Sequence, residues 1–299
     1  MSARLLGLDL WLRLTTKRRL RTASVPAARE RMERDAALLP VPPGAAWSAA
    51  RLGGVAAQRL APPPGAGLIL WFHGGAYCLG SPATHGPMVA ALALAAGAGA
   101  VLPAYRLAPE APFPAAVEDA AAVWDALAAE GWPAGRIVVG GDSAGGGLAF
   151  ALLHRLLAAG APPPAGVVAF SPWTDLTLGA ASLRRLARRD ALLPAERIGE
   201  ARDLYLAGAD PADPRASPIL GRFPGAPPVL IQASRAEILL DDARGMAARL
   251  RADGVAVELE LERGVPHAWQ GFAGVLPEAD AALARAGAFA AARLAVNKA

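Results

Sequence analysis

The chain has 299 residues, enough for one large hydrophobic core or two ordinary ones, and 54% of its residues are hydrophobic. Its single cysteine excludes an intramolecular disulfide, so no oxidising compartment is required. The net charge of +4 is uneven: residues 1–34 hold nine Arg and Lys against three acidic residues, so the remainder carries −2. A slightly acidic body argues against a nucleic-acid partner.

The basic arm, residues 1–34, contains a short amphipathic pattern. Arginines alternate with apolar residues that recur near helical spacing, namely Leu5, Leu8, Trp11 or Leu12, and Leu14. Such a helix can lie on a membrane surface or pack on its own domain, and the shortness of the stripe favours packing. Asp9 and Arg13 interrupt the apolar run, which argues against a signal peptide. We therefore expect a cytoplasmic protein with no stable insertion into a membrane.

From residue 68 onward, short apolar runs alternate with alanine-rich helical patterns. Strands are predicted at 68–73, 100–105, 136–141, 166–171, 228–233 and 257–262. Helices are predicted near 84–96, 115–130, 145–159 and 240–253. Strands that are apolar throughout, separated by helices, indicate a mostly parallel central sheet with helices on both faces, an α/β fold. The last run alternates apolar and polar residues, as an edge strand does.

Two segments fall outside this alternation. Residues 1–45 precede the sheet, and residues 176–222 interrupt it with arginine-rich helical sequence and ADPADPRASP. Two such segments beside one sheet predict a helical cap assembled from separate parts. We therefore treat residues 1–299 as one domain whose cap elements are 1–45 and 176–222.

The strongest chemical signal is the pentapeptide Gly141-Asp142-Ser143-Ala144-Gly145, which fits G-x-S-x-G. It follows a predicted strand and opens a predicted helix, the context in which this motif presents a nucleophilic serine. A sharp strand-to-helix turn lifts the serine out of the sheet and leaves no room for side chains two residues away on either side. The helix N-terminus also favours negative charge at this point. We therefore predict that Ser143 is the nucleophile.

A serine nucleophile needs a base and an acid, which follow it in this order: acid, then histidine. His154 lies on the same helix, roughly 16 Å further along at 1.5 Å per residue, and cannot reach the hydroxyl. His267 follows the last strand, at the edge where Ser143 emerges, and is predicted as the base. Glu237 follows the preceding strand and is favoured as the acid. Asp241 and its neighbour Asp242, which resemble helix-capping carboxylates, come later, and Asp241 stays open as the alternative.

The stretch LILWFHGGAYCLG, residues 68–80, offers a second histidine and the lone cysteine. The N–H groups of Gly74 and Gly75, together with that of Ala144, are predicted to form an oxyanion hole. His73 then anchors this loop through hydrogen bonds and takes no proton. Cys78 is expected to be a partly buried apolar residue, because the base that a thiol nucleophile needs is committed elsewhere. His85 is expected to be a helix-start or loop residue, and His154 a helix-surface residue.

Five motifs occur in order along the chain: HGGAY, YRLAPEAPFPAAVEDA, GDSAGG, SPWTDL and PHAW. Together they resemble the hormone-sensitive-lipase-like bacterial esterases, which are α/β-hydrolases with an N-terminal helical cap. The resemblance runs from about residue 40 to the C-terminus and, more loosely, over the arm. It implies the same nucleophile, base and oxyanion donors. The members that the chain resembles most are described as monoterpene ε-lactone hydrolases and short-chain carboxylesterases.

Two departures from the family pattern concern the acid and the oxyanion loop. The family's acid is usually the aspartate of a D-P-L stretch, and the matching position here is Glu237, 30 residues before His267 as the family spacing requires. This change keeps Asp241 as an alternative. Ala76 stands where many members have a third glycine, which implies an altered pocket shape with the same chemistry.

These observations predict a carboxylic-ester hydrolase that acts on short-chain acyl esters or small lactones through an acyl-enzyme. Four histidines and one cysteine provide no zinc-like spacing, so neither a metal nor a cofactor is expected. An amide or formamide hydrolase on the same scaffold stays open as an alternative. A small-molecule receptor without turnover is the second alternative, against which the presence of His267 argues. A homodimer is left open as the oligomeric state.

Overall fold

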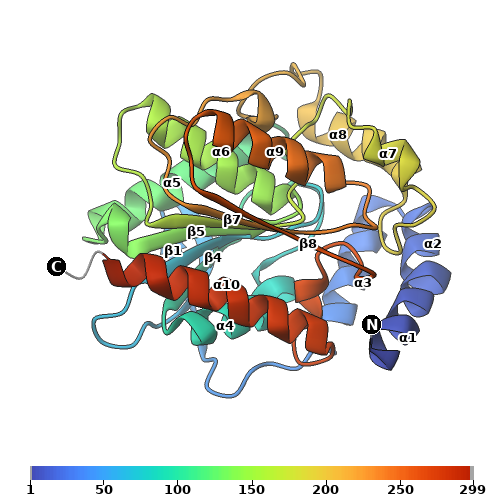
Figure 1. Ribbon diagram of the computed structural model, residues 1–299, viewed down its shortest axis with the longest axis horizontal. Helices are drawn as coiled ribbons and strands as arrows, with labels where there is room; N and C mark the ends of the chain where they lie inside the picture. The colour runs from blue at the N-terminus through green and yellow to red at the C-terminus, as the bar shows by residue number, and fades with distance from the viewer. Residues whose placement is uncertain (1, 297–299) are drawn as a thin grey trace.

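The computed structural model describes residues 2–296, and its centre is one eight-stranded sheet (Figure 1). The strands lie in the spatial order β1-β2-β4-β3-β5-β6-β7-β8. They comprise β1 Trp47–Leu52, β2 Val55–Leu60, β3 Leu68–Phe72, β4 Gly99–Pro103, β5 Ile137–Asp142, β6 Gly166–Phe170, β7 Val229–Ser234 and β8 Val257–Glu262. All six predicted strands are present.

The six strands from β3 to β8 run parallel, as their apolar composition predicts. Every residue of β3 to β7 is buried, whereas β8 is half-exposed and lies at the edge of the sheet. In the register of the central strands, Phe72 of β3 pairs with Gly141 of β5, and Asp142 pairs with Phe170 of β6. The ends of β3, β5 and β6 therefore meet at one edge of the sheet, where Ser143 follows.

The antiparallel hairpin of β1 and β2 was not predicted from the sequence. Its strands are rich in alanine, which has little strand propensity, so they do not show the apolar runs of the other strands. The two-residue turn Gly53-Gly54, in which both residues have positive φ, is the signal that could have revealed it. Strand β2 pairs with β4 antiparallel, so the hairpin extends the parallel sheet at the edge opposite β8.

Helices cover both faces of the sheet, as predicted (Figure 1). On one face lie α4 Pro82–Ala96 and α10 Pro277–Val296, which contact each other. On the other face lie α5 Ala115–Ala129, α6 Ala144–Ala158 and α9 Leu240–Ala252. Side chains alternate along β3 between the two cores: Ile69 and Trp71 join the first face, and Leu70 and Phe72 join the second. Short turns of helix complete the fold at η2 Ala134–Arg136, η4 Pro218–Leu220 and η5 Trp269–Phe272.

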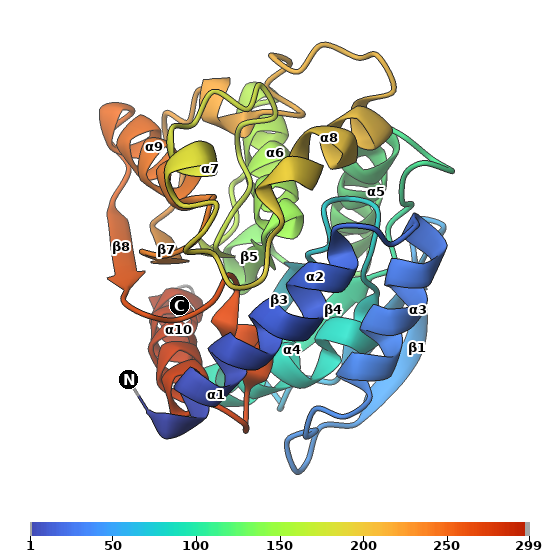
Figure 2. The same cartoon turned by 90° about the vertical axis from the view of Figure 1, so that its right-hand side faces the viewer.

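The arm and the 176–222 segment lie together across the edge of the sheet where the parallel strands end (Figure 2). The arm consists of α1 Ala3–Trp11, η1 Leu12–Thr16, α2 Lys17–Leu20 and α3 Val25–Ala36. The segment contains α7 Ser182–Arg185, η3 Ala195–Arg197 and α8 Ile198–Leu206. Arg13 of the arm donates to the carbonyl of Arg188 at 2.9 Å, and Arg197 donates to that of Arg21 at 2.8 Å. Two regions far apart in sequence are thus joined by arginines bound to main-chain carbonyls.

One side of the arm packs on the protein, and the other side faces out. Leu5 and Leu12 of the predicted stripe are buried, whereas Leu14, which was predicted on the same stripe, is exposed together with Leu6 and Leu10. The buried positions fit the interpretation that the arm packs on its own domain. Within residues 2–296, the structure contains no helix long and apolar enough to cross a membrane.

Candidate active site

Ser143 lies at the sharp turn between β5 and α6, in the context that the motif predicts. Its φ of 54° and ψ of −122° are values that L-residues rarely adopt, so the surrounding structure must impose them. Its N–H donates to the carbonyl of Phe170 at 2.8 Å, and its carbonyl accepts from the N–H of Trp173 at 2.9 Å. The turn is therefore held against the end of β6.

The glycines on either side of Ser143 are there because backbone occupies the space that side chains would need. A Cβ on Gly145 would meet the carbonyl oxygens of Phe72 and His73, and a Cβ on Gly141 would meet the backbone of Gly145. This confirms the predicted crowding two residues before and two residues after the serine. Helix α6 can therefore begin directly against the end of β3.

The structure brings His267 and Glu237 together, although they lie 30 residues apart. His267 Nδ1 lies 2.8 Å from Glu237 Oε2, and both side chains are buried. Since a carboxylate only accepts, Nδ1 carries the proton of this bond and Nε2 is the nitrogen left for a reacting group. Glu237 Oε1 also accepts from the N–H of Ser234 at 3.3 Å, which ties the carboxylate to the end of β7.

The loop that carries His267 is attached next to Ser143. The N–H of Ala268 donates to the hydroxyl of Ser171 at 3.1 Å, and Ser171 directly follows the β6 residue that binds the N–H of Ser143. Ser143, His267 and Glu237 thus lie at one edge of the sheet, where the sequence leads us to expect them. Burial raises the pKa of Glu237, and the hydrogen bond and charge of His267, followed by the hydrogen bond of the Ser171 hydroxyl, offset only part of this rise.

The environment of His267 strengthens it as a base. Burial by itself lowers the pKa of His267, but the hydrogen bond and the charge of Glu237 outweigh burial and leave the pKa above its usual 6.5. Asp190 and Asp142 act in the same direction from a greater distance. A histidine that holds a proton more tightly is better able to take one from a hydroxyl group.

Glu237 lies in the loop of residues 235–239 between β7 and α9, which we call the acid loop. Asp241 lies just after this loop, in the first turn of α9. It accepts from the N–H of Ser182 at 2.9 Å and from Arg185 at 3.0 Å, in the 176–222 segment. Asp242 is buried and accepts from the N–H groups of Thr174 and Asp175. Both lie in the first turn of α9, as predicted, but neither side chain caps this helix, because each binds a different stretch of chain. Neither forms a hydrogen bond with His267, whereas Glu237 does.

The predicted oxyanion loop follows β3, and its histidine acts as the anchor that the sequence predicts. His73 is buried, and its ring Nδ1 lies 2.8 Å from the carbonyl oxygen of Gly74, to which it donates. Burial lowers the pKa of His73 to about 3, so the ring is neutral and takes no part as a charged group. Tyr105 donates to the carbonyl of His73 at 2.7 Å. Gly75 has a φ of 121°, and a Cβ there would meet the carbonyl of Leu79.

The surroundings of Cys78 make its thiol a poor nucleophile. Its side chain is buried more completely than expected, and burial raises the pKa of its thiol to about 11. A thiol with so high a pKa is protonated at neutral pH and is a poor nucleophile. The carbonyl of Cys78 instead accepts from Arg29 of the arm at 2.7 Å.

A buried ion pair beneath Ser143 was missed by the sequence analysis. His85 Nε2 lies 3.1 Å from Asp142 Oδ2, and Trp71 donates to Asp142 Oδ1 at 3.0 Å. The charge of Asp142 raises the pKa of His85 against the effect of burial. His85 is therefore a structural partner of the serine turn, which is more than the expected helix-start residue. The polar residue before Ser143, in an otherwise apolar strand, is the signal that could have suggested a buried partner.

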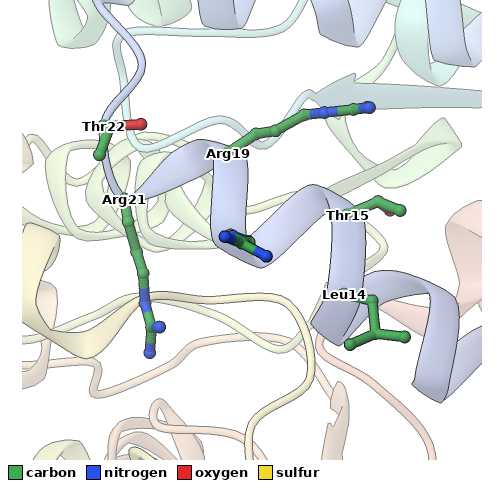
Figure 3. Close-up of a pocket in the computed structure, with 6 residues that line it drawn as sticks. Leu14, Thr15, Arg19, Arg21 and Thr22 are labelled. Carbon is green, nitrogen blue, oxygen red and sulfur yellow. The ribbon is translucent and has the colours of Figure 1, made fainter.

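Two further places on the chain lie outside this site. His154 is half-buried against Phe223, with ring centroids 5.9 Å apart, so it is less exposed than predicted. A hollow of about 510 Å³ opens on the arm (Figure 3), lined by Leu14, Thr15, Arg18, Arg19, Arg21 and Thr22. The side chains of Arg19 and Arg21 extend in different directions in Figure 3, so they do not converge on one anion. Among residues 2–296, no three His, Cys, Asp or Glu side chains are grouped to hold a metal ion.

This arrangement belongs to a known family of enzymes. A family model described as the alpha/beta hydrolase fold matches residues 69–271, which span most of the sheet and the proposed site. The chain therefore belongs to the alpha/beta hydrolase family. The prediction of a hormone-sensitive-lipase-like esterase on this fold is confirmed.

The relatives are named as hydrolases of esters or acetyl groups. An acetyl-hydrolase of Streptomyces hygroscopicus is 45% identical over 221 residues, 74% of each chain. An esterase of Acinetobacter venetianus is 37% identical over 242 residues, 80% of each chain. A crystal structure of an esterase from the bacterial hormone-sensitive lipase family superposes with a TM-score of 0.92 at 38% identity, covering 98% of this chain and 99% of the other.

Proposed function

We propose that the chain hydrolyses short-chain acyl esters or small lactones through an acyl-enzyme on Ser143. The observation that carries this proposal is the buried hydrogen bond between His267 and Glu237, held beside the strained turn of Ser143. A serine, a histidine and a carboxylate in these relations are the parts that acyl transfer requires. Glu237 is the acid in this proposal, because it forms the hydrogen bond with His267.

The reaction proceeds in two transfers of one acyl group. His267 Nε2 takes the proton of Ser143 Oγ while the oxygen forms a bond to the ester carbonyl carbon. The tetrahedral intermediate then breaks its bond to the alcohol oxygen, which receives the proton from His267. In the second half, His267 takes a proton from water, the water oxygen attacks the acyl-enzyme, and Ser143 recovers its proton as the acid leaves. Glu237 keeps the imidazole oriented and stabilises its positive charge throughout.

The oxyanion in this proposal rests on the N–H groups of Gly74, Gly75 and Ala144. Ala144 is the first residue of α6, where the helix dipole favours negative charge. The two glycines follow β3, whose end lies beside the Ser143 turn. Each donor of this kind is typically worth about 3 kcal/mol of transition-state stabilisation.

The size of the substrate is inferred from the structure around the oxyanion loop. The arm and the 176–222 segment form the proposed cap, and Tyr77 of the loop stacks on Tyr205 of α8 with ring centroids 3.8 Å apart. Both tyrosines and the nearby Trp173 are buried, so bulky side chains fill the space between the loop and the cap. A crowded site favours short acyl groups or compact lactones. The chain also superposes on a crystal structure of EstE5 with a TM-score of 0.93 at 35% identity, covering 99% of this chain and 100% of the other, and that crystal was soaked with the short-chain ester p-nitrophenyl butyrate.

A panel of p-nitrophenyl esters from acetate to palmitate tests this proposal, with a p-nitroanilide included for amide hydrolysis. We expect turnover that is highest for the short acyl chains, and a fall in kcat of about 10⁴-fold or more in Ser143→Ala. Cys78→Ala is the matched control and should keep kcat within a few-fold. Unchanged turnover in Ser143→Ala would overturn the mechanism, and faster cleavage of the anilide would assign the chain to amide hydrolysis.

The cytoplasmic location and the homodimer stay predictions from the sequence. Cell fractionation tests the first, and light scattering of the purified full-length chain tests the second. We propose that the chain works on dissolved small-molecule substrates, since its arm packs on its own domain.

A further inference from the structure

A second buried carboxylate, Asp190, lies beside the acid loop and has no part in the proposed mechanism. Asp190 belongs to the 176–222 segment, and its side chain is 1% exposed. Its Oδ1 accepts from the N–H groups of Leu192 and Leu193, each at 2.8 Å. Its Oδ2 accepts from the N–H of Ile238 at 2.9 Å. The burial of a charge is costly unless it is well hydrogen-bonded, and three main-chain donors meet that condition here.

The bond from Ile238 matters because Ile238 directly follows Glu237. Its N–H belongs to the peptide group that begins at the Glu237 carbonyl, so holding this peptide limits the rotation of the Glu237 backbone. The carbonyl of Ile238 accepts from the hydroxyl of Ser182 at 2.6 Å. Both polar main-chain groups of Ile238 are therefore bound by the 176–222 segment, and neither is bound by the body of the sheet.

The arm reaches the same point through a buried lysine. Lys17 is 6% exposed, and its ammonium group donates to the carbonyl oxygens of Asp190 at 2.7 Å and Ala187 at 2.8 Å. Burial lowers the pKa of Lys17, and the charge of Asp190 opposes this effect. A lysine is rarely buried unless its charge is compensated, so this contact indicates a specific attachment of the arm. The chain of contacts runs from Lys17 to Asp190, to Ile238 and so to Glu237.

We propose that Asp190 is a positioning residue for the acid Glu237, and that Lys17 fastens the arm to it, so that docking of the cap and alignment of the acid are one event. This inference rests on the proposed function, because it assigns Glu237 to the triad. The cap is then part of the catalytic framework as well as a cover. If the acid is displaced, the imidazole loses its orientation, and a displacement of about 1 Å can cost about 100-fold in rate.

The charge of Asp190 also has an effect that a merely structural role would not have, which is a change in the pKa of His267. The charges of three carboxylates raise the pKa of His267: Glu237, which is bound to it, and Asp190 and Asp142, which are bound to other groups. The removal of the Asp190 charge should therefore lower the pKa of His267. The acidic limb of the pH profile of kcat/KM, on which His267 must lose its proton, should then move to lower pH.

The test compares Asp190→Asn with Asp253→Asn in the full-length chain. Asp253 is the matched control, because it also joins two segments by accepting a main-chain N–H, that of Phe223 at 2.7 Å, and it pairs with Arg222 at the end of the 176–222 segment without contacting the residue after Glu237. We expect Asp190→Asn to lower kcat for p-nitrophenyl butyrate about 10- to 100-fold, with KM within about threefold, and to move the acidic limb to lower pH. Asp253→Asn should lower the melting temperature and leave kcat and the limb unchanged. A folded Asp190→Asn with the kcat and pH profile of the control would overturn the proposal.

A second variant, Lys17→Met, tests the same proposal independently of whether Asp190→Asn folds, and an NMR measurement tests it independently of turnover. If Asp190→Asn does not fold, Lys17→Met keeps the carboxylate and removes only its attachment to the arm, and we expect kcat to fall by about fivefold, a milder displacement of the acid. A kcat equal to that of the wild type in Lys17→Met would also count against the proposal. The far-downfield proton resonance of the bond between His267 and Glu237 reports their alignment without any turnover. It should shift or broaden in Asp190→Asn and stay unchanged in Ser143→Ala, so loss of the proposed function and loss of this inference give different results.

Discussion

The nucleophile and the acid of the proposed triad are held by two different kinds of structure. Ser143 sits in a turn between a buried strand and a helix, and the side chains that would disturb it are replaced by glycine. Glu237 sits in a loop whose next residue, Ile238, is bound by Asp190 and Ser182, residues 48 and 56 positions away in sequence. The first site is built from close backbone packing, and the second from hydrogen bonds to the proposed cap.

This difference predicts which kind of substitution should disrupt each site. The serine turn has no spare space, so it fails when atoms are added. The acid loop depends on distant partners, so it fails when a partner is removed or detached. The first failure affects folding as a whole, because the strands beside the turn form the centre of the core. The second affects catalysis more than stability.

The largest effect is expected from Gly145→Ala. The added Cβ would meet the main-chain oxygens of Phe72 and His73, which cannot move without breaking the sheet. We expect the free energy of unfolding to fall by about 3 kcal/mol or more, measured by urea titration, with the loss of turnover. Gly7→Ala in α1 is the control, because a Cβ there meets no atom within 4 Å, and it should not destabilise the chain. A stable, active Gly145→Ala would show that the turn tolerates added volume.

Glu237→Gln should have the next largest effect, and almost all of it on catalysis. The glutamine can donate to His267 and so favour the wrong tautomer, for which we expect a fall in kcat of about 10³- to 10⁴-fold with little change in melting temperature. Asp241→Asn is the matched control, since Asp241 contacts Ser182 and Arg185 and lies away from the imidazole. We expect kcat within tenfold of the wild type in Asp241→Asn. The reverse order of the two losses would move the acid to Asp241.

The features that the sequence predicted well are those encoded by neighbouring residues. Ser143 and its glycines lie within five residues, so the motif carries its own context. Of the six parallel strands, β3 to β7 are largely apolar runs, as burial on both faces requires, and β8 alternates as an edge strand does. His267 could be placed because the end of the last parallel strand must lie at the same edge as Ser143. Each of these inferences needs only local composition and the rules of parallel sheets.

The features that escaped prediction depend on contacts between distant residues. Asp190 looks like an ordinary acid in an arginine-rich stretch, and only the fold brings it to Ile238. The pairing of His85 with Asp142 crosses 57 residues in the same way. The alanine-rich strands β1 and β2 carry too little strand propensity to stand out from a loop. Burial of a polar side chain is decided by tertiary packing, and composition alone does not reveal it.

Leu5→Ala tests the attachment of the arm at its other end. Leu5 is fully buried in a small cluster with Val265 and Trp269, which flank His267 in the chain. We expect the arm to lose about 2 kcal/mol of local stability. Amide hydrogen exchange of residues 3–20 should then be faster in the variant than in the wild type, with β5 as the internal reference, and kcat should fall a few-fold. Leu10→Ala, on the exposed side of the same helix, should change exchange by less than about 0.5 kcal/mol. Equal effects of the two substitutions would show that the arm is not held by its buried side.

Asp242→Asn at pH 4 gives the smallest expected effect, and its dependence on pH contrasts the two carboxylates Asp190 and Asp242, which lie before and after the acid loop in the chain. Asp190 is bound by three N–H groups through both oxygens, whereas Asp242 accepts two N–H groups through Oδ1 alone. Burial raises the pKa of Asp242 to about 8, with the carboxylates of Asp175 and Glu237 acting in the same direction. Its Oδ2 is therefore free to hold a proton at neutral pH.

Because the folded-state pKa of Asp242 lies above the value of about 4 in an unfolded chain, the folded protein binds this proton more tightly. The stabilisation is complete below pH 4 and is lost as pH rises through about 8. Asparagine keeps the Oδ1 acceptor and does not titrate, so the melting temperatures of wild type and Asp242→Asn should agree within about 2 °C near pH 4 and separate in favour of the variant as pH rises to 9. Parallel curves would show that Asp242 is ionised throughout. In that case Asp242, on the body of the protein, would be a charged carboxylate like Asp190 in the proposed cap. The contrast between these two carboxylates would then disappear.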